Sequence, residues 1–217
     1  MNIICICCVI QVMHKKILTI GDSHSSDVHS HWGKINIEGL EIIAGHIGPK
    51  LAYTLGRGAI SDMVIQQINN AKLKKDDLII FCMGEIDCRC HVSDKSKGKD
   101  WRQVIREIVF PYLEKIKELT NNFSEVYVYN VTPTRNTPEQ EVGEFPFRGE
   151  PQERREYTLY MNKIIMENCE KFGSKFFDIY SSIVCPEGFL NLSQADASIH
   201  VVDPLPAQEF LLKNVLI

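Results

Sequence analysis

The stretch KKILTIGDSHS, residues 15–25, decides the fold expected for this chain of 217 residues. Residues 16–20 form a short apolar run with β-branched side chains, which is typical of a buried strand. Gly21, Asp22 and Ser23 follow at once, and residues of these types favour a turn. The stretch therefore predicts a first strand that ends in a tight turn carrying a serine.

Short β-prone runs alternate with longer segments of helical period along the rest of the chain. This alternation favours parallel strands joined by crossover helices. We predict a three-layer α/β/α fold with a five-stranded parallel sheet. The predicted strands are Lys16–Ile20, Leu40–Ala44, Leu78–Met83, Val126–Val131 and Phe176–Ile179, and the predicted helices are Gly58–Ala71, Asp100–Thr120, Gln152–Phe172 and Ala207–Val215.

Prolines affect two of the segments that connect the strands. Pro111 is expected to kink the helix at 100–120 or to split it, because proline removes a backbone hydrogen bond. The stretch 132–151 follows a strand, holds four prolines and is longer than most connections in compact domains. We interpret it as a lid or a loop that contacts substrate.

The composition is that of an ordinary globular protein. Hydrophobic residues make up 44% and charged residues 24%, and the net charge is -4 with the signs interspersed. A chain of this length can serve one hydrophobic core, so we predict a single domain over 15–217. The charge pattern predicts no nucleic-acid partner.

Residues 1–14 are interpreted as an apolar extension ahead of that domain, and the alternatives are an added strand or core-docking arm and a weak lipid-modified anchor. Their apolar run is too short to span a bilayer, and it lacks the basic start of a secretory signal, so we predict no transmembrane segment. The eight cysteines are then expected to be reduced, as in a cytoplasmic protein. Residue types that bind zinc stand close together at Cys82, Cys88, Cys90 and His91. However, no second pair of cysteines or histidines at the spacing of zinc ligands follows, so no metal site is predicted.

Residues able to do chemistry follow the first three predicted strands. The carboxyl ends of parallel strands meet at one edge of a sheet, where active sites lie. The sequence there is GDSH at 21–24, GHIGP at 45–49 and GEIDCR at 84–89. His200 lies near the carboxyl end, just before the last predicted helix. The four blocks are therefore expected at one edge.

In this order, the four blocks resemble those of the SGNH hydrolases, the GDSL-like esterases and lipases. The resemblance spans about residues 15–215, with residues 84–89 as a divergent third block. It implies the flavodoxin-like fold of that family, no cofactor, and a catalytic triad with Ser23 as nucleophile and His200 as its base. A serine hydroxyl needs such a base to become reactive at neutral pH. The structural alternative for Ser23 is the N-cap of a helix.

Two departures from the family pattern affect the mechanism. The family acid usually lies three residues before the histidine, where this chain has Ala197, so Asp196 is the candidate acid. Asp203 and a backbone carbonyl are the alternatives. The family also places an oxyanion-binding asparagine where this chain has Ile86. The oxyanion hole would then consist of the backbone N–H groups of Ser23 and Gly48.

Charged residues around these blocks are candidates for binding substrate or supporting the site. Arg89 is the first candidate to replace the missing donor, directed at the substrate or at Asp87, and an internal salt-bridge network is the alternative. His24 and His46 are expected near the site but not as its base. The full set of supporting candidates is Asp22, His24, Glu85, Asp87 and Arg89.

The resemblance implies a serine esterase or deacetylase that works through an acyl-enzyme. Its expected partner is a small-molecule or glycan ester with a small acyl group, because the loop residues are polar and no apolar groove is evident. The alternatives are an O-acyltransferase with the same site and a binding protein whose catalytic geometry has decayed. The sequence makes no prediction about oligomeric state.

Overall fold

A five-stranded parallel sheet forms the centre of the computed structural model, which describes residues 14–140 and 143–215. Its strand order is β2-β1-β3-β4-β5, and all four pairings are parallel. This confirms the predicted fold class. The predicted apolar extension lies outside the described residues except for its last residue. The strands are β1 (Lys15–Gly21), β2 (Leu40–His46), β3 (Leu78–Cys82), β4 (Glu125–Tyr129) and β5 (Lys175–Phe177).

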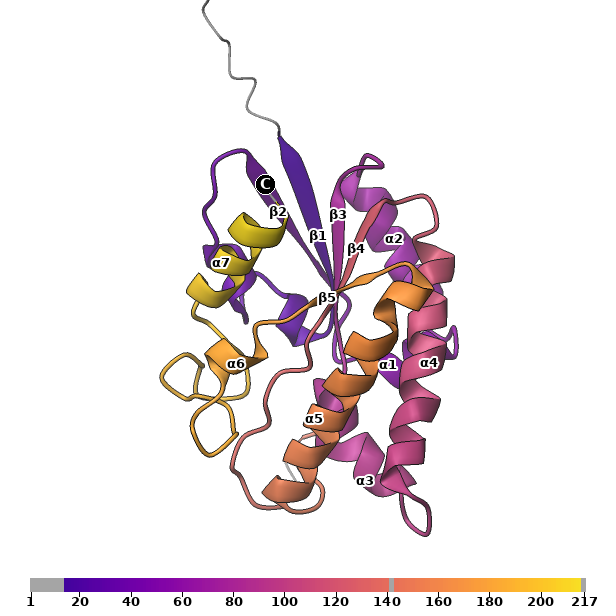
Figure 1. The fold of residues 1–217 in the computed structure, drawn as a ribbon, viewed down its shortest axis with the longest axis vertical. Coiled ribbons are helices and arrows are strands. Elements are labelled where there is room, and N and C mark those ends of the chain that lie inside the picture. Colours follow the sequence, from indigo (N-terminus) through magenta and orange to yellow (C-terminus); the bar gives the residue numbers. More distant parts are fainter. Residues whose placement is uncertain (1–13, 141–142, 216–217) are drawn as a thin grey trace, which may run out of the picture.

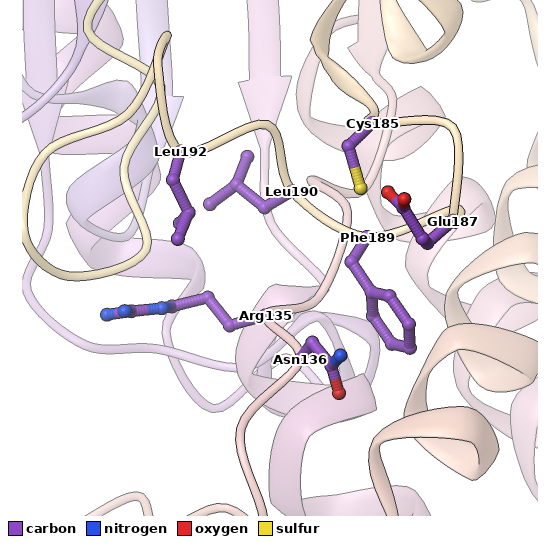
Figure 2. Close-up of a pocket in the computed structure, with 7 residues that line it drawn as sticks. All are labelled: Arg135, Asn136, Cys185, Glu187, Phe189, Leu190 and Leu192. Atoms are coloured by element: carbon purple, nitrogen blue, oxygen red, sulfur yellow. The ribbon is translucent and has the colours of Figure 1, made fainter.

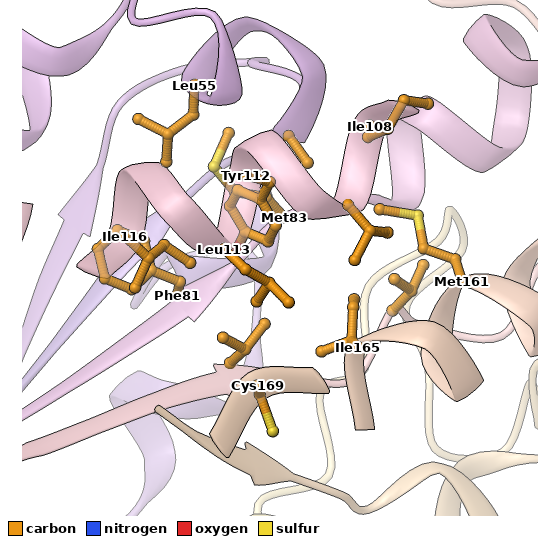
Figure 3. Close-up of a cluster of buried hydrophobic side chains, with 14 of the residues drawn as sticks. Leu55, Phe81, Met83, Ile108, Tyr112, Leu113, Ile116, Met161, Ile165 and Cys169 are labelled. Atoms are coloured by element: carbon orange, nitrogen blue, oxygen red, sulfur yellow. The ribbon is translucent and has the colours of Figure 1, made fainter. Parts of the chain in front are cut away.

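Helices cover both faces of the sheet, as the alternating sequence pattern requires (Figure 1). Successive side chains of a strand point to opposite faces of the sheet, so each inner strand contributes side chains to a hydrophobic core on either face. In β3, Ile79 and Phe81 join the cluster shown in Figure 3, whereas Leu78 and Ile80 join the core on the other face. The helices are α1 (Ala52–Gly56), α2 (Ser61–Ala71), α3 (Val92–Lys95), α4 (Trp101–Leu119), α5 (Pro151–Asn168), α6 (Tyr180–Ile183) and α7 (Leu205–Asn214).

Of the two outcomes predicted at Pro111, a kink or a split of the long helix, the split is wrong. The helix α4 runs without a break through Pro111. Buried side chains on both sides of the proline, among them Ile108 and Leu113, pack into the core of Figure 3. Tertiary packing supplies most of the stability of a helix in a protein, so it outweighs the one lost hydrogen bond.

The helical period of the segment 152–172 places Tyr157, Met161, Ile164 and Ile165 on one face and Arg154 away from it, and the second part of this pattern needs a correction. Tyr157, Met161, Ile164 and Ile165 are buried, as the periodicity predicts. However, Arg154 is fully buried too, although the sequence pattern assigned it to the solvent side. It lies three and seven residues before Tyr157 and Met161, which is the spacing of one helix face.

Candidate active site

The chain turns sharply at Ser23, directly after the inner strand β1. A Cβ at Gly21 would lie only 2.0 Å from the carbonyl oxygen of Cys82, so no larger residue fits there. Asp22 is fully buried, and its Oδ1 accepts a 2.9 Å hydrogen bond from the backbone N–H of His24. This capping carboxylate opens a short 3-10 helix, Ser23–Ser25, and fixes the turn that presents Ser23.

The structure brings Ser23, His200 and Asp196 together in one chain of hydrogen bonds. The Ser23 Oγ lies 2.8 Å from Nε2 of His200, and Nδ1 of His200 lies 2.7 Å from Oδ2 of Asp196. These three side chains come from the start and the end of the chain. A hydroxyl, an imidazole and a carboxylate in this order can move a proton away from the hydroxyl.

The one-residue departure in the position of the acid is absorbed by a tight turn between Asp196 and His200. The backbone N–H of Asp196 donates to the carbonyl of His200 over 2.9 Å, and Oδ1 of Asp196 accepts from the N–H groups of Ser198 and His200. Burial alone would raise the pKa of Asp196, but the hydrogen bonds from the His200 ring and these N–H groups hold it below its ordinary value. The carboxylate is therefore ionised at neutral pH.

The alternative acid, Asp203, does not contact the His200 ring. Its Oδ1 accepts from the backbone N–H of Leu205 at the start of α7, over 3.0 Å. Its Oδ2 accepts a longer hydrogen bond from Gln194. Asp203 therefore binds the first residue of α7, and the geometry leaves Asp196 as the carboxylate beside the imidazole.

The segment that follows β2 carries Gly48, the second candidate oxyanion donor. Gly48 has a φ of 81°, a conformation that favours glycine. Among residues 14–140 and 143–215, no group accepts a hydrogen bond from its N–H. Asp87 anchors the next helix by accepting from the N–H groups of Ala52 and Tyr53, over 2.7 and 3.2 Å. Asp87 therefore holds the start of α1 and, with it, the segment between β2 and α1 that contains Gly48.

The third block supplies an ion pair instead of the missing amide donor. Ile86 is buried, and an isoleucine side chain cannot donate a hydrogen bond. The Nε of Arg89 lies 3.3 Å from Oε1 of Glu85, and the guanidinium also faces the ring of Phe147. This ion pair is the internal salt bridge given as the alternative for Arg89, and the carboxylate of Asp87 faces the start of α1 instead of Arg89.

Two histidine rings lie beside the candidate base, and a third lies beside one of them. The ring centroid of His24 lies 5.3 Å from that of His200, and the centroid of His29 lies 5.6 Å from it. His46 in turn lies beside His29. Burial lowers the pKa of His24 well below its ordinary value, so this ring is neutral at pH 7. His29 was not singled out from the sequence, because lone loop histidines give no signal of what they pack against.

Two buried side chains that the sequence did not single out fix the loops around the site. The guanidinium of Arg154 donates to the carbonyl oxygens of Thr137, Arg148 and Gly149. It thereby ties the stretch interpreted as a lid to helix α5. His31 contacts the carbonyl of Val201 through Nδ1, over 3.4 Å, directly after the candidate base.

The buried histidine His31 gives a prediction about stability. Burial lowers its pKa from 6.5 to about 4. The unfolded chain therefore binds more protons between pH 4 and 6.5, so stability is present above pH 6.5 and is lost as the pH falls toward 4. We expect the free energy of unfolding of wild type to fall more steeply in this window than that of His31→Asn, by up to about 1.4 kcal/mol per pH unit.

Urea unfolding at several pH values across and above this window measures the difference. Asparagine keeps a side-chain N–H near the position of Nδ1 and does not titrate in this range. Parallel pH curves for the two proteins would show that His31 does not remain neutral in the folded state.

The fold of this chain is similar to that of several solved structures. No family model matches this sequence, and no curated protein matches it. Solved structures do match. A protein from Streptococcus pneumonia, described as a platelet activating factor, is 17% identical with a TM-score of 0.62, over 96% of this chain and 87% of the other.

A GDSL-like lipase from Bacteroides thetaiotaomicron is 14% identical with a TM-score of 0.55, over 94% of this chain and 90% of the other. An acetylxylan esterase from Geobacillus stearothermophilus is 14% identical with a TM-score of 0.50, over 93% and 94%. This chain thus has the α/β fold of the GDSL-like hydrolases. The resemblance drawn from the four sequence blocks is confirmed at the level of the fold. Within the described residues, no helix is both long and apolar enough to cross a membrane.

Proposed function

We propose that this chain is a serine ester hydrolase of the SGNH type. The observation that carries the proposal is the set of hydrogen bonds linking Ser23, His200 and Asp196 at the carboxyl edge of the sheet. The likeness of the fold to GDSL-like lipases and to an acetylxylan esterase supports it. Residues near the site that supply no chemistry, such as Asp22 and Asp87, support the turns on which it is built.

The proposed reaction proceeds in two steps. Oγ of Ser23 attacks the ester carbonyl while Nε2 of His200 removes the hydroxyl proton, and the same proton then passes to the departing alkoxide. An acyl-enzyme on Ser23 and a free alcohol result. Water attacks the acyl-enzyme with His200 again as base, which releases the acid and restores the serine. Asp196 keeps the imidazole in the required tautomer throughout.

The oxyanion in this proposal is bound by the backbone N–H groups of Ser23 and Gly48. The free N–H of Gly48 within the described part of the chain and its glycine-specific conformation support its part. With Ile86 in place of an asparagine, one donor fewer is available than in the family pattern. Loss of one such donor typically costs a factor of about 10²–10³ in kcat, so we expect slow turnover.

The substrate that we propose is a small acyl ester, with an acetyl group on a carbohydrate as the specific candidate. The polar residues at the site and the acetylxylan esterase among the structural neighbours support it. An O-acyltransferase would share every step up to the acyl-enzyme and differ only in its acceptor. The replacement at Ile86 is the observation that favours the remaining alternative, a binding protein of this fold.

Hydrolysis of a series of p-nitrophenyl esters tests this proposal. We expect acetate to be the best acyl group, with kcat/KM falling by about tenfold or more from acetate to octanoate. Acetate release from acetylated xylan tests the carbohydrate part. Formation of an acetylated sugar when free sugar is added would favour the transferase, and no turnover of any ester would favour the binding protein.

A further inference from the structure

A hollow of about 300 Å³ lies next to the turn that carries the candidate base. Its volume is at the lower end of the range for small-molecule sites. Figure 2 shows side chains from two separate loops facing one another across it. Its lining residues are Arg135, Asn136, Cys185, Glu187, Phe189, Leu190 and Leu192.

Arg135 connects this hollow with the triad. Its Nη1 donates to the carbonyl oxygens of Ala197 and Ser198, over 2.7 and 2.9 Å. Both carbonyls belong to the turn between Asp196 and His200. The guanidinium therefore forms part of the wall of the hollow and also holds the turn on which the imidazole sits.

Backbone contacts place the hollow at the same edge of the sheet as Ser23. Leu190 donates its N–H to the carbonyl of Thr134, just beyond β4, over 2.9 Å. Two residues earlier, Oγ1 of Thr132 contacts the ring of His24. The lining segment 189–192 then continues directly into the turn with the base.

The chemistry of the lining fits a ring that carries hydroxyl groups. Phe189, Leu190 and Leu192 offer apolar surface to the face of a ring (Figure 2). Arg135 and Asn136 offer N–H donors, and Glu187 offers a carboxylate whose pKa is lowered by a hydrogen bond with Cys185. A hydroxyl group both donates and accepts, so it can use each of these groups. An acyl chain can use none of the polar groups, and the carboxylate repels an anion.

We propose that this hollow binds the sugar ring of the ester's alcohol part. This inference rests on the proposed function, because it assigns the hollow to the alcohol part of the ester that Ser23 would cleave. Arg135 then links the occupied hollow to the turn that positions His200. The expected ligand is a neutral sugar unit, and the acyl group lies outside the hollow.

The variants Asn136→Ala and Leu192→Ala test the proposal, with acetylated methyl xyloside and p-nitrophenyl acetate as substrates. Both side chains are exposed, Leu192 to 56%, so their loss leaves the core intact. We expect each variant to raise KM for the acetylated xyloside about tenfold, as loss of substrate binding does, and to change KM for p-nitrophenyl acetate much less. Leu212→Ala, which removes an exposed leucine of α7, is the matched control.

The outcomes separate this proposal from the proposed function. If wild type hydrolyses both esters but the two variants match Leu212→Ala in KM for the xyloside, the hollow is not the sugar site. If the variants instead change the preference between p-nitrophenyl acetate and octanoate, the hollow takes the acyl chain and the proposal is wrong. If wild type hydrolyses neither ester, the proposed function itself fails.

Discussion

Replacing Ser23 or His200 by alanine is expected to lower kcat/KM for p-nitrophenyl acetate by about 10⁶-fold, and by about the same factor in either variant. The two side chains act as a unit, since the hydroxyl is reactive only while Nε2 of His200, 2.8 Å away, can take its proton. The double variant should therefore be no slower than either single variant. Initial rates at several substrate concentrations measure all three.

Matched controls separate chemistry from folding. Ser181→Ala removes an exposed serine of α6, and His14→Ala removes an exposed histidine ahead of β1, at the opposite end of that strand from Ser23. Both controls should keep wild-type rates. If His200→Ala retained substantial activity, the assignment of His200 as base would be wrong.

Asp196→Asn is expected to lower kcat by about 10⁴-fold, less than the loss of the serine or the histidine. The carboxylate accepts from Nδ1 of His200 over 2.7 Å and leaves Nε2 free to accept the serine proton. An asparagine amide can donate to Nδ1 instead, which would place the imidazole proton on Nε2, facing Ser23. The base would then be blocked in the ground state.

Asp203→Asn is the control for this prediction, since Asp203 accepts from the first residue of α7 and makes no hydrogen bond with the imidazole. Steady-state kinetics of both variants with p-nitrophenyl acetate measure the two values of kcat. An unchanged rate in Asp196→Asn, or a larger loss in Asp203→Asn, would contradict the assignment of the acid.

Local sequence signals were sufficient for the fold, whereas the candidate triad was implied by the resemblance to the SGNH hydrolases. Each strand is a short apolar run ended by turn residues, and parallel order follows from the helical segments between strands. Once the strands are parallel, their carboxyl ends share an edge, which is why Ser23 could be expected there. The tight turn from Asp196 to His200 was conceivable from one extra residue, but its closing hydrogen bonds could be seen only in the structure.

Side-chain partners across long sequence distances could not be predicted in the same way. Arg89 has carboxylates at positions 85 and 87, and only the direction of each side chain decides that Glu85 is the partner. The sequence pattern assigned Arg154 to the solvent side, because the carbonyl groups that make its burial favourable lie on a loop with no regular pattern. The structural role of Arg135 depends on a turn that is distant in the sequence.

The most direct test of the central claim is covalent labelling by a fluorophosphonate probe, with the modified residue located by peptide mass spectrometry. The account predicts that wild type is labelled on Ser23, that Ser23→Ala is not labelled, and that His200→Ala reacts far more slowly. Absence of labelling in folded wild-type protein, or labelling of a different residue, would contradict it.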